Sequence, residues 1–178
     1  DMDGTLLDLH FDNYFWQHYL LVRYSQQHRL PFLQVQQELQ VLFKQHQGTL
    51  NWYCLDFWQR QLQLDIMRLK QEVAHLIKLR PFVIEFLSSL KRLNKRVVLI
   101  TNAHPKILEF KMQHIQLQTY FDQMISSHTL GYPKEDARFW EKLQTVENFN
   151  RMTTLFIDDS LPILYAATNF GIRYVFGV

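Results

Sequence analysis

Short apolar runs alternate with helical segments through the second half of this chain, and this alternation restricts the possible folds more than any other feature. The apolar runs predict strands over residues 96–101, 124–127, 154–157 and 172–176. Between them, apolar residues at helical spacing predict helices over 83–93, 105–115, 135–146 and 161–170. Repeated strand–helix–strand units require a parallel sheet with helices on both faces. The expected fold class is therefore α/β.

The first half of the chain has a different pattern. Residues 11–79 are rich in glutamine, leucine and aromatic residues at helical spacing, which predicts about four helices. This region separates residues 1–10 from the α/β pattern that covers 80–178. We expect two units: an α/β core made from residues 1–10 and 80–178, and a helical insert over 11–79.

Composition and charge exclude several classes of protein. The 178 residues carry a formal charge of +2 without a basic block, so nothing predicts a surface for a nucleic-acid polymer. No apolar run is long enough to span a membrane. The single cysteine, Cys54, excludes an internal disulfide and a multi-cysteine metal site, which fits a reducing compartment, and we expect a cytoplasmic protein. Its apolar neighbours predict an inert buried thiol.

The chain begins with Asp1-Met2-Asp3-Gly4-Thr5. Alternate residues at a strand end project to the same side, so Asp1 and Asp3 can face one phosphate, as a nucleophile and a proton donor. Two like charges this close raise at least one pKa, which favours a protonated Asp3. The competing interpretation is a polar turn, because short motifs often match by chance. A strand is expected before such a site, so we expect that the sequence is a fragment without its first strand.

Polar residues also follow two of the predicted strands. Thr101 and Asn102 can hold a phosphate oxygen through a hydroxyl and a backbone N–H at a helix N-terminus. Asp158 and Asp159 offer the oxygen ligands that Mg²⁺ prefers, although they could instead cap the helix that starts near residue 161. Lys134 is expected to begin a helix, where a cation is unfavourable unless a phosphate or an aspartate offsets its charge.

Together, these motifs resemble the four motifs of the haloacid dehalogenase-like (HAD) hydrolase superfamily. The resemblance implies a Rossmann-like core, an aspartyl-phosphate intermediate at Asp1, acid–base work by Asp3 and phosphate contacts from Thr101, Asn102 and Lys134. It also implies an Mg²⁺ ion held by the following groups: Asp1, the backbone carbonyl of Asp3, Asp158 and Asp159. The helical insert resembles a small mobile cap that closes over the substrate and excludes water.

Longer segments resemble the purine 5′-nucleotidases of this superfamily, and they imply a small phosphomonoester substrate such as GMP or IMP. These segments cover residues 9–16, 51–56, 101–105 and 131–136. The alternatives are a sugar-phosphate phosphatase or phosphoglucomutase with the same catalytic centre, and a non-catalytic interaction module.

Which residues of the insert contact a substrate is left open by the sequence. Four aromatic residues could stack on a purine, although at helical spacing most of them are expected in the core: Trp16, Trp52, Tyr53 and Trp58. His10, Asn13 and His104 lie near the inferred cleft and could meet ribose or phosphate, or could serve as helix caps and surface polar residues.

Overall fold

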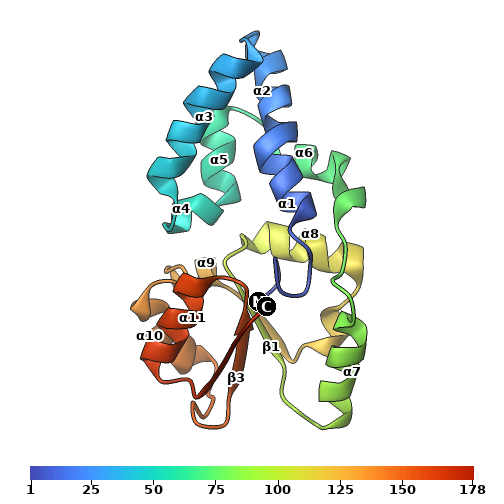
Figure 1. Cartoon of the computed structure of the whole chain (residues 1–178), viewed down its shortest axis with the longest axis vertical. Helices are drawn as coiled ribbons and strands as arrows, with labels where there is room; N and C mark the ends of the chain where they lie inside the picture. The colour runs from blue at the N-terminus through green and yellow to red at the C-terminus, as the bar shows by residue number, and fades with distance from the viewer.

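The computed structural model describes residues 1–178, which form two lobes joined by extended segments (Figure 1). The upper one, here called the helical lobe, contains α1 (His10–Tyr14), η1 (Phe15–Tyr19), α2 (Leu20–His28), α3 (Phe32–His46), α4 (Leu50–Tyr53), α5 (Leu55–Leu62), α6 (Ile66–Glu72) and η2 (Ala74–Leu76). The η1 segment is a π-helical turn that joins α1 to α2. Cys54 is extended and separates α4, which carries Trp52, from α5, which carries Trp58.

The lower part, here called the α/β lobe, contains the alternating elements. In chain order they are α7 (Val83–Arg92), β1 (Val98–Thr101), α8 (Pro105–Ile115), η3 (Gln118–Tyr120), β2 (Gln123–Ser126), α9 (Ser127–Leu130), α10 (Ala137–Val146), β3 (Leu155–Asp158), α11 (Leu161–Phe170) and β4 (Tyr174–Gly177). The four strands and four longer helices lie within a few residues of their predicted positions. The α/β class is therefore confirmed.

The sheet differs from the expectation of one continuous parallel sheet. Strand β1 pairs with β2 in parallel, with Thr101 opposite Ser126, and β3 pairs with β4 in parallel, but no ladder joins the two pairs. The backbone nitrogen of Asp1 instead donates to the carbonyl of Ile157 on β3 at 3.0 Å. In Figure 1 the N-terminus lies near the upper ends of β1 and β3. The chain turns at Gly4, where φ is positive, and Asp3 forms only an isolated bridge with Leu7.

The larger hydrophobic core runs through both lobes. It includes Phe15 and Trp58 from the helical lobe and Leu99 and Met112 from the α/β lobe. Helix α8 lies directly beneath the helical lobe in Figure 1 and supplies part of this shared core. A second, smaller core packs around Trp140, between the strands and helices α10 and α11. None of the helices combines the length and apolar character needed to cross a bilayer.

An ion pair on the α/β lobe predicts a pH dependence of stability. The Arg96 guanidinium donates to both oxygens of the buried Glu147 carboxylate, at 2.6 and 2.8 Å, and these bonds lower the pKa of Glu147 from 4.5. A lowered folded-state pKa stabilises the protein above pH 4.5, and that stabilisation is lost as the pH falls through the folded value. Glu147→Gln should therefore show a shallower fall of the thermal midpoint in this range, measured by circular dichroism. Glu141→Gln, on an exposed position of α10, should follow the wild type.

Candidate active site

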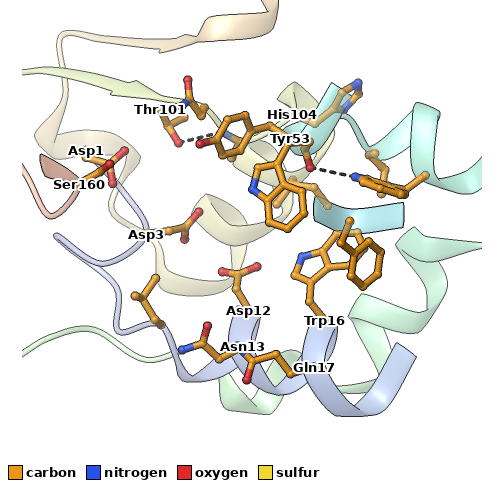
Figure 2. Close-up of a pocket in the computed structure, with 18 of the residues that line it drawn as sticks. Asp1, Asp3, Asp12, Asn13, Trp16, Gln17, Tyr53, Thr101, His104 and Ser160 are labelled. Carbon is orange, nitrogen blue, oxygen red and sulfur yellow. Dashed lines mark hydrogen bonds between the residues drawn. The ribbon is translucent and has the colours of Figure 1, made fainter. Parts of the chain in front are cut away.

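One cavity of about 620 Å³ lies where the two lobes meet. The following predicted site residues all line it: Asp1, Asp3, Thr101, Asn102, Lys134, Asp158 and Asp159. Figure 2 shows Asp1 and Ser160 at one end of this cavity and Trp16 and Gln17 of the helical lobe at the other. Four separated segments of sequence thus contribute polar groups to a single space.

Lys134 is the central cation of this site. Its side chain is only 1% exposed, and its Nζ donates to Asp1 Oδ1 and to Asp158 Oδ2, both at 2.6 Å. The expectation that Lys134 begins a helix is wrong: it lies in a turn, and α10 begins at Ala137 with Asp136 as its N-cap. The two carboxylates, rather than a helix dipole, therefore set the surroundings of this ammonium group.

The three carboxylates next to Lys134 fit a divalent cation. Oxygen atoms of Asp1, Asp158 and Asp159 all lie within 4.8 Å of one another. Burial, and secondly the charge of Asp158, raises the pKa of Asp159. Like charges crowded in a partly buried site repel one another, and a hard cation with oxygen ligands relieves that repulsion. Asp158 Oδ1 also accepts from Ser160 N at 3.0 Å, but Ser160 is itself the N-cap residue and no side chain caps the first turn of α11, so the helix-capping interpretation does not account for these acids.

Asp3 faces a buried charge network that the sequence analysis missed. Lys111 Nζ donates to Asp3 Oδ1 at 2.6 Å and also to Asp12, while Lys70 Nζ donates to Asp12 Oδ1 at 3.0 Å. Burial raises the pKa of Asp3, against the opposing effect of Lys111. From the sequence, the charge of the nearby Asp1 was expected to raise the pKa of Asp3. In the structure, however, the Asp1 carboxylate is bonded to Lys134. Burial also opposes charge on Asp12, yet the two ammonium groups outweigh it and lower the Asp12 pKa.

A sequence signal for this network did exist. Lys111 shares the buried face of α8 with Leu108 and Met112, and Lys70 lies beside Leu69 on the buried face of α6. A lysine at an apolar position of an amphipathic helix is rarely buried without a partner. Such positions therefore indicate buried anions elsewhere in the fold.

Thr101 and Asn102 lie where they were expected, at the end of β1, but their side chains differ in whether they are free to bind a phosphate. Thr101 Oγ1 accepts from Ala103 N at 3.0 Å, which leaves its hydroxyl proton to donate to a ligand. The Asn102 side chain is already bonded, accepting from Lys134 N and donating to Glu135 Oε2, both at 2.9 Å. The side chain of Asn102 therefore holds the Lys134 turn in place, and only its backbone N–H remains available for phosphate.

Contacts between the lobes also surround the cavity. Tyr53 in the helical lobe donates to Glu135 Oε1 at 2.6 Å. His104 lines the cavity and accepts from Lys106 N at 3.4 Å, as an N-cap of α8. Cys54 differs from the expected inert buried thiol, because it is partly exposed, caps α5 and lies within reach of His104 and His128. Burial lowers the pKa of both histidines, that of His128 to about 4.

The aromatic residues divide into two groups. Trp16, Trp52 and Tyr53 line the cavity, whereas Trp58, although it borders the cavity, is 1% exposed and donates through Nε1 to Trp52 O at 2.9 Å. Trp58 is thus a core residue. His10 is exposed, while Asn13 joins the residues that line the cavity.

Gly4 gives a direct test of the packing around the acidic group. Its φ is +85°, and a Cβ at this position would lie 2.1 Å from Asp159 Oδ2. Gly4→Ala must therefore displace Asp159 as well as adopt a strained backbone, at a cost of about 1 to 3 kcal/mol. We expect a lower urea midpoint and weaker binding of a divalent cation at the three carboxylates. Gly48→Ala, at a positive φ with open space around it, should lower stability without changing the binding of the cation.

Comparisons with known proteins agree with this geometry. A sequence profile described as haloacid dehalogenase-like hydrolase matches residues 1–176. The chain is 45% identical over 178 residues to the GMP/IMP nucleotidase YrfG of Escherichia coli (strain K12). This alignment covers 100% of this chain and 80% of YrfG. The crystal structure of a HAD phosphatase from Thermococcus onnurineus superimposes with a TM-score of 0.82 at 20% identity. The match covers 99% of this chain and 83% of the Thermococcus chain.

The crystal structure of a putative beta-phosphoglucomutase from Thermotoga maritima has a TM-score of 0.68 at 19% identity. The match covers 99% of this chain and 82% of the Thermotoga chain. The two crystal structures show the same fold. The profile match and the YrfG relative both extend over almost the whole chain and include its two acidic segments, Asp1-Met2-Asp3 and Asp158-Asp159. This chain is an enzyme of the haloacid dehalogenase-like hydrolase family.

Proposed function

We propose that this enzyme is a magnesium-dependent 5′-nucleotidase that removes phosphate from purine nucleoside monophosphates, with GMP and IMP as its substrates. The observation that carries the proposal is a single cavity that joins the acidic cluster to an aromatic and amide-rich wall in the helical lobe. The YrfG relative, named as a GMP/IMP nucleotidase, supports the same substrate class.

The wall that faces the carboxylates has the chemistry that a nucleobase needs. Trp16, Phe43 and Trp52 supply apolar faces, and the amides of Asn13, Gln17, Gln36 and Gln40 supply donors and acceptors. Base stacking on an aromatic side chain contributes about 1 to 3 kcal/mol. Amide groups can recognise the polar edge of a purine through paired hydrogen bonds. The phosphate and the base therefore have separate, complementary places.

Asp1 acts as the nucleophile of the reaction, and Asp3 acts as its acid and base. An Asp1 oxygen attacks phosphorus while the bond to the ribose 5′-oxygen breaks, and Asp3 gives its proton to that oxygen. Water then attacks the aspartyl-phosphate, Asp3 takes the proton of the water, and inorganic phosphate leaves. The raised pKa of Asp3 supports its first role, because the protonated form must be present when the substrate binds.

Cations around the phosphate offset its negative charge. Lys134 lies against Asp1 and Asp158, and Thr101 supplies a hydroxyl beside it. We propose that Asp1, the backbone carbonyl of Asp3, Asp158 and Asp159 hold Mg²⁺, and the crowding of the carboxylates supports this. When bound, the ion supplies positive charge to the phosphate oxygens.

We also propose that residues 11–79 act as a cap over the α/β core formed by residues 1–10 and 80–178. Two contacts support this: Tyr53 reaches Glu135, and Asp12 shares Lys111 with Asp3. Both join the helical lobe to residues of the catalytic region. A cap that closes in this way excludes water while the ester is cleaved.

Phosphate release from a panel of monoesters tests the proposal. We expect GMP and IMP to exceed pyrimidine nucleotides, glucose 1-phosphate and glycerol 2-phosphate in kcat/KM, and EDTA to stop turnover. Trp16→Leu should lower kcat/KM for GMP by about 10- to 100-fold while leaving glycerol 2-phosphate nearly unchanged, because only the base loses its stacking partner.

Phe57→Leu is the matched control, since Phe57 belongs to the same aromatic cluster but does not line the cavity. Preference for glucose 1-phosphate would favour a sugar-phosphate phosphatase, and its conversion without phosphate release would favour a mutase. Failure to hydrolyse any monoester in the presence of Mg²⁺ would instead support a non-catalytic interaction module.

A further inference from the structure

Three potential metal ligands that the phosphate chemistry does not use lie at the boundary between the lobes. Cys54 belongs to the helical lobe, between α4 and α5, whereas His104 follows β1 and His128 lies on α9. One ligand atom from each residue lies within 4.8 Å of the others. The rings of His104 and His128 are 5.0 Å apart at an angle of 68°. Three separate segments thus bring a thiol and two imidazoles together.

The hydrogen bonding of this cluster is incomplete. The Nε2 atom of His128 is buried and has no hydrogen-bond partner. Buried polar side-chain atoms are nearly always bonded, so such an atom indicates a missing water, ion or ligand. Cys54 Sγ accepts a 3.4 Å bond from Phe57 N, which holds the sulfur in place at the start of α5.

We propose that Cys54, His104 and His128 bind one zinc ion between the helical lobe and the α/β lobe. Zinc combines thiolate sulfur and imidazole nitrogen, whereas Mg²⁺ prefers oxygen, so the two metals select different sites in this protein. Donors at zinc distances of about 2.0 and 2.3 Å in tetrahedral geometry lie roughly 3.5 Å apart. Because the three donors already lie within 4.8 Å of one another, small side-chain rotations are sufficient to reach this geometry.

The two ring nitrogens of His104 have different neighbours. Asp56 Oδ2 lies 3.7 Å from Nε2, on the side where a carboxylate can orient the ring, and zinc at Nδ1 would replace the long 3.4 Å bond from Lys106 N. With three protein ligands, the fourth position belongs to water. Because Cys54 is in one lobe and both histidines are in the other, the bound ion resists separation of the lobes. Zinc should therefore inhibit turnover if the cap must open to release product.

Cobalt substitution in the whole protein tests the site. Cys54 is the only cysteine, so a thiolate-to-cobalt charge-transfer band can arise from this position alone. With saturating Mg²⁺ present, we expect one equivalent of Co²⁺ to produce the band and Zn²⁺ to abolish it. His104→Asn and His128→Asn should each weaken binding by at least about 10-fold.

Cys54→Ser is the decisive control. Serine is a good N-cap, so α5 should persist and basal activity should stay unchanged. We expect this variant to lose the band and to lose inhibition by Zn²⁺. Cobalt bound by the wild type without a thiolate band, or a band that survives His104→Asn combined with His128→Asn, would overturn the site. Equal inhibition of wild type and Cys54→Ser by Zn²⁺ would show that zinc at this site does not inhibit turnover by holding the lobes together.

Discussion

Asp1→Asn is expected to lower phosphate release from GMP by at least about 10⁴-fold while the protein stays folded, as for other essential members of a catalytic group. An amide has the shape of the carboxylate but is a poor nucleophile, so the aspartyl-phosphate cannot form. The amide oxygen can still accept from Lys134 Nζ, which preserves the buried contact that holds this segment. Phosphate release and thermal unfolding should be measured on the same preparation.

Asp65→Asn is the matched control for this change. Asp65 is exposed, caps α6 and lies outside the cavity, and asparagine caps a helix about as well as aspartate. It should therefore keep wild-type activity. Full activity of Asp1→Asn would remove Asp1 as the nucleophile and with it the proposed reaction sequence.

Lys134→Met should damage both stability and activity. Removing the buried ammonium leaves Asp1 and Asp158 without the partner that each contacts at 2.6 Å. Breaking a buried ion pair from one side costs about 3 to 5 kcal/mol, because the remaining charge is uncompensated. The loss of positive charge near the phosphate should also lower kcat by about 10²- to 10³-fold. Urea unfolding and phosphate release measure the two effects separately.

Two further variants separate the causes. Lys142→Met changes an exposed lysine on α10 and should leave both measurements near wild type. Lys134→Met combined with Asp158→Asn removes a buried charge of each sign, so it should recover part of the stability but none of the activity. A Lys134→Met protein as stable as the wild type would contradict the buried pairing.

Local patterns in the sequence were sufficient for the elements of the α/β lobe. The apolar run before Thr101 and the helix ended by Gly171 lie where they were predicted, since strand and helix periods and a left-handed C-cap are encoded by neighbouring residues. The helix start expected at Lys134 was wrong because the Asp136 side chain, which accepts from Arg138 N at 2.9 Å, caps a helix that begins three residues later, at Ala137.

The residue types of the candidate site could also be proposed from the sequence, because aspartyl-phosphate chemistry needs a particular set of acids, hydroxyl and amine. Their roles depended on partners distant in sequence. Asn102 was predicted to hold phosphate through its backbone N–H, and only the structure shows that its side chain is used by Lys134 N and Glu135. The raised pKa of Asp3 comes from burial, which no spacing between acidic residues reveals.

The sequence by itself determined the alternation of strands and helices, and it predicted the helical region and the acids of the candidate site, because these follow from local periodicity and residue chemistry. Only the tertiary structure decided that Lys111 joins Asp3 to Asp12, and that Cys54 lies beside His104 and His128. These contacts connect residues from different lobes. Burial and long-range pairing fix the energies of such groups, and both exist only after the chain has folded.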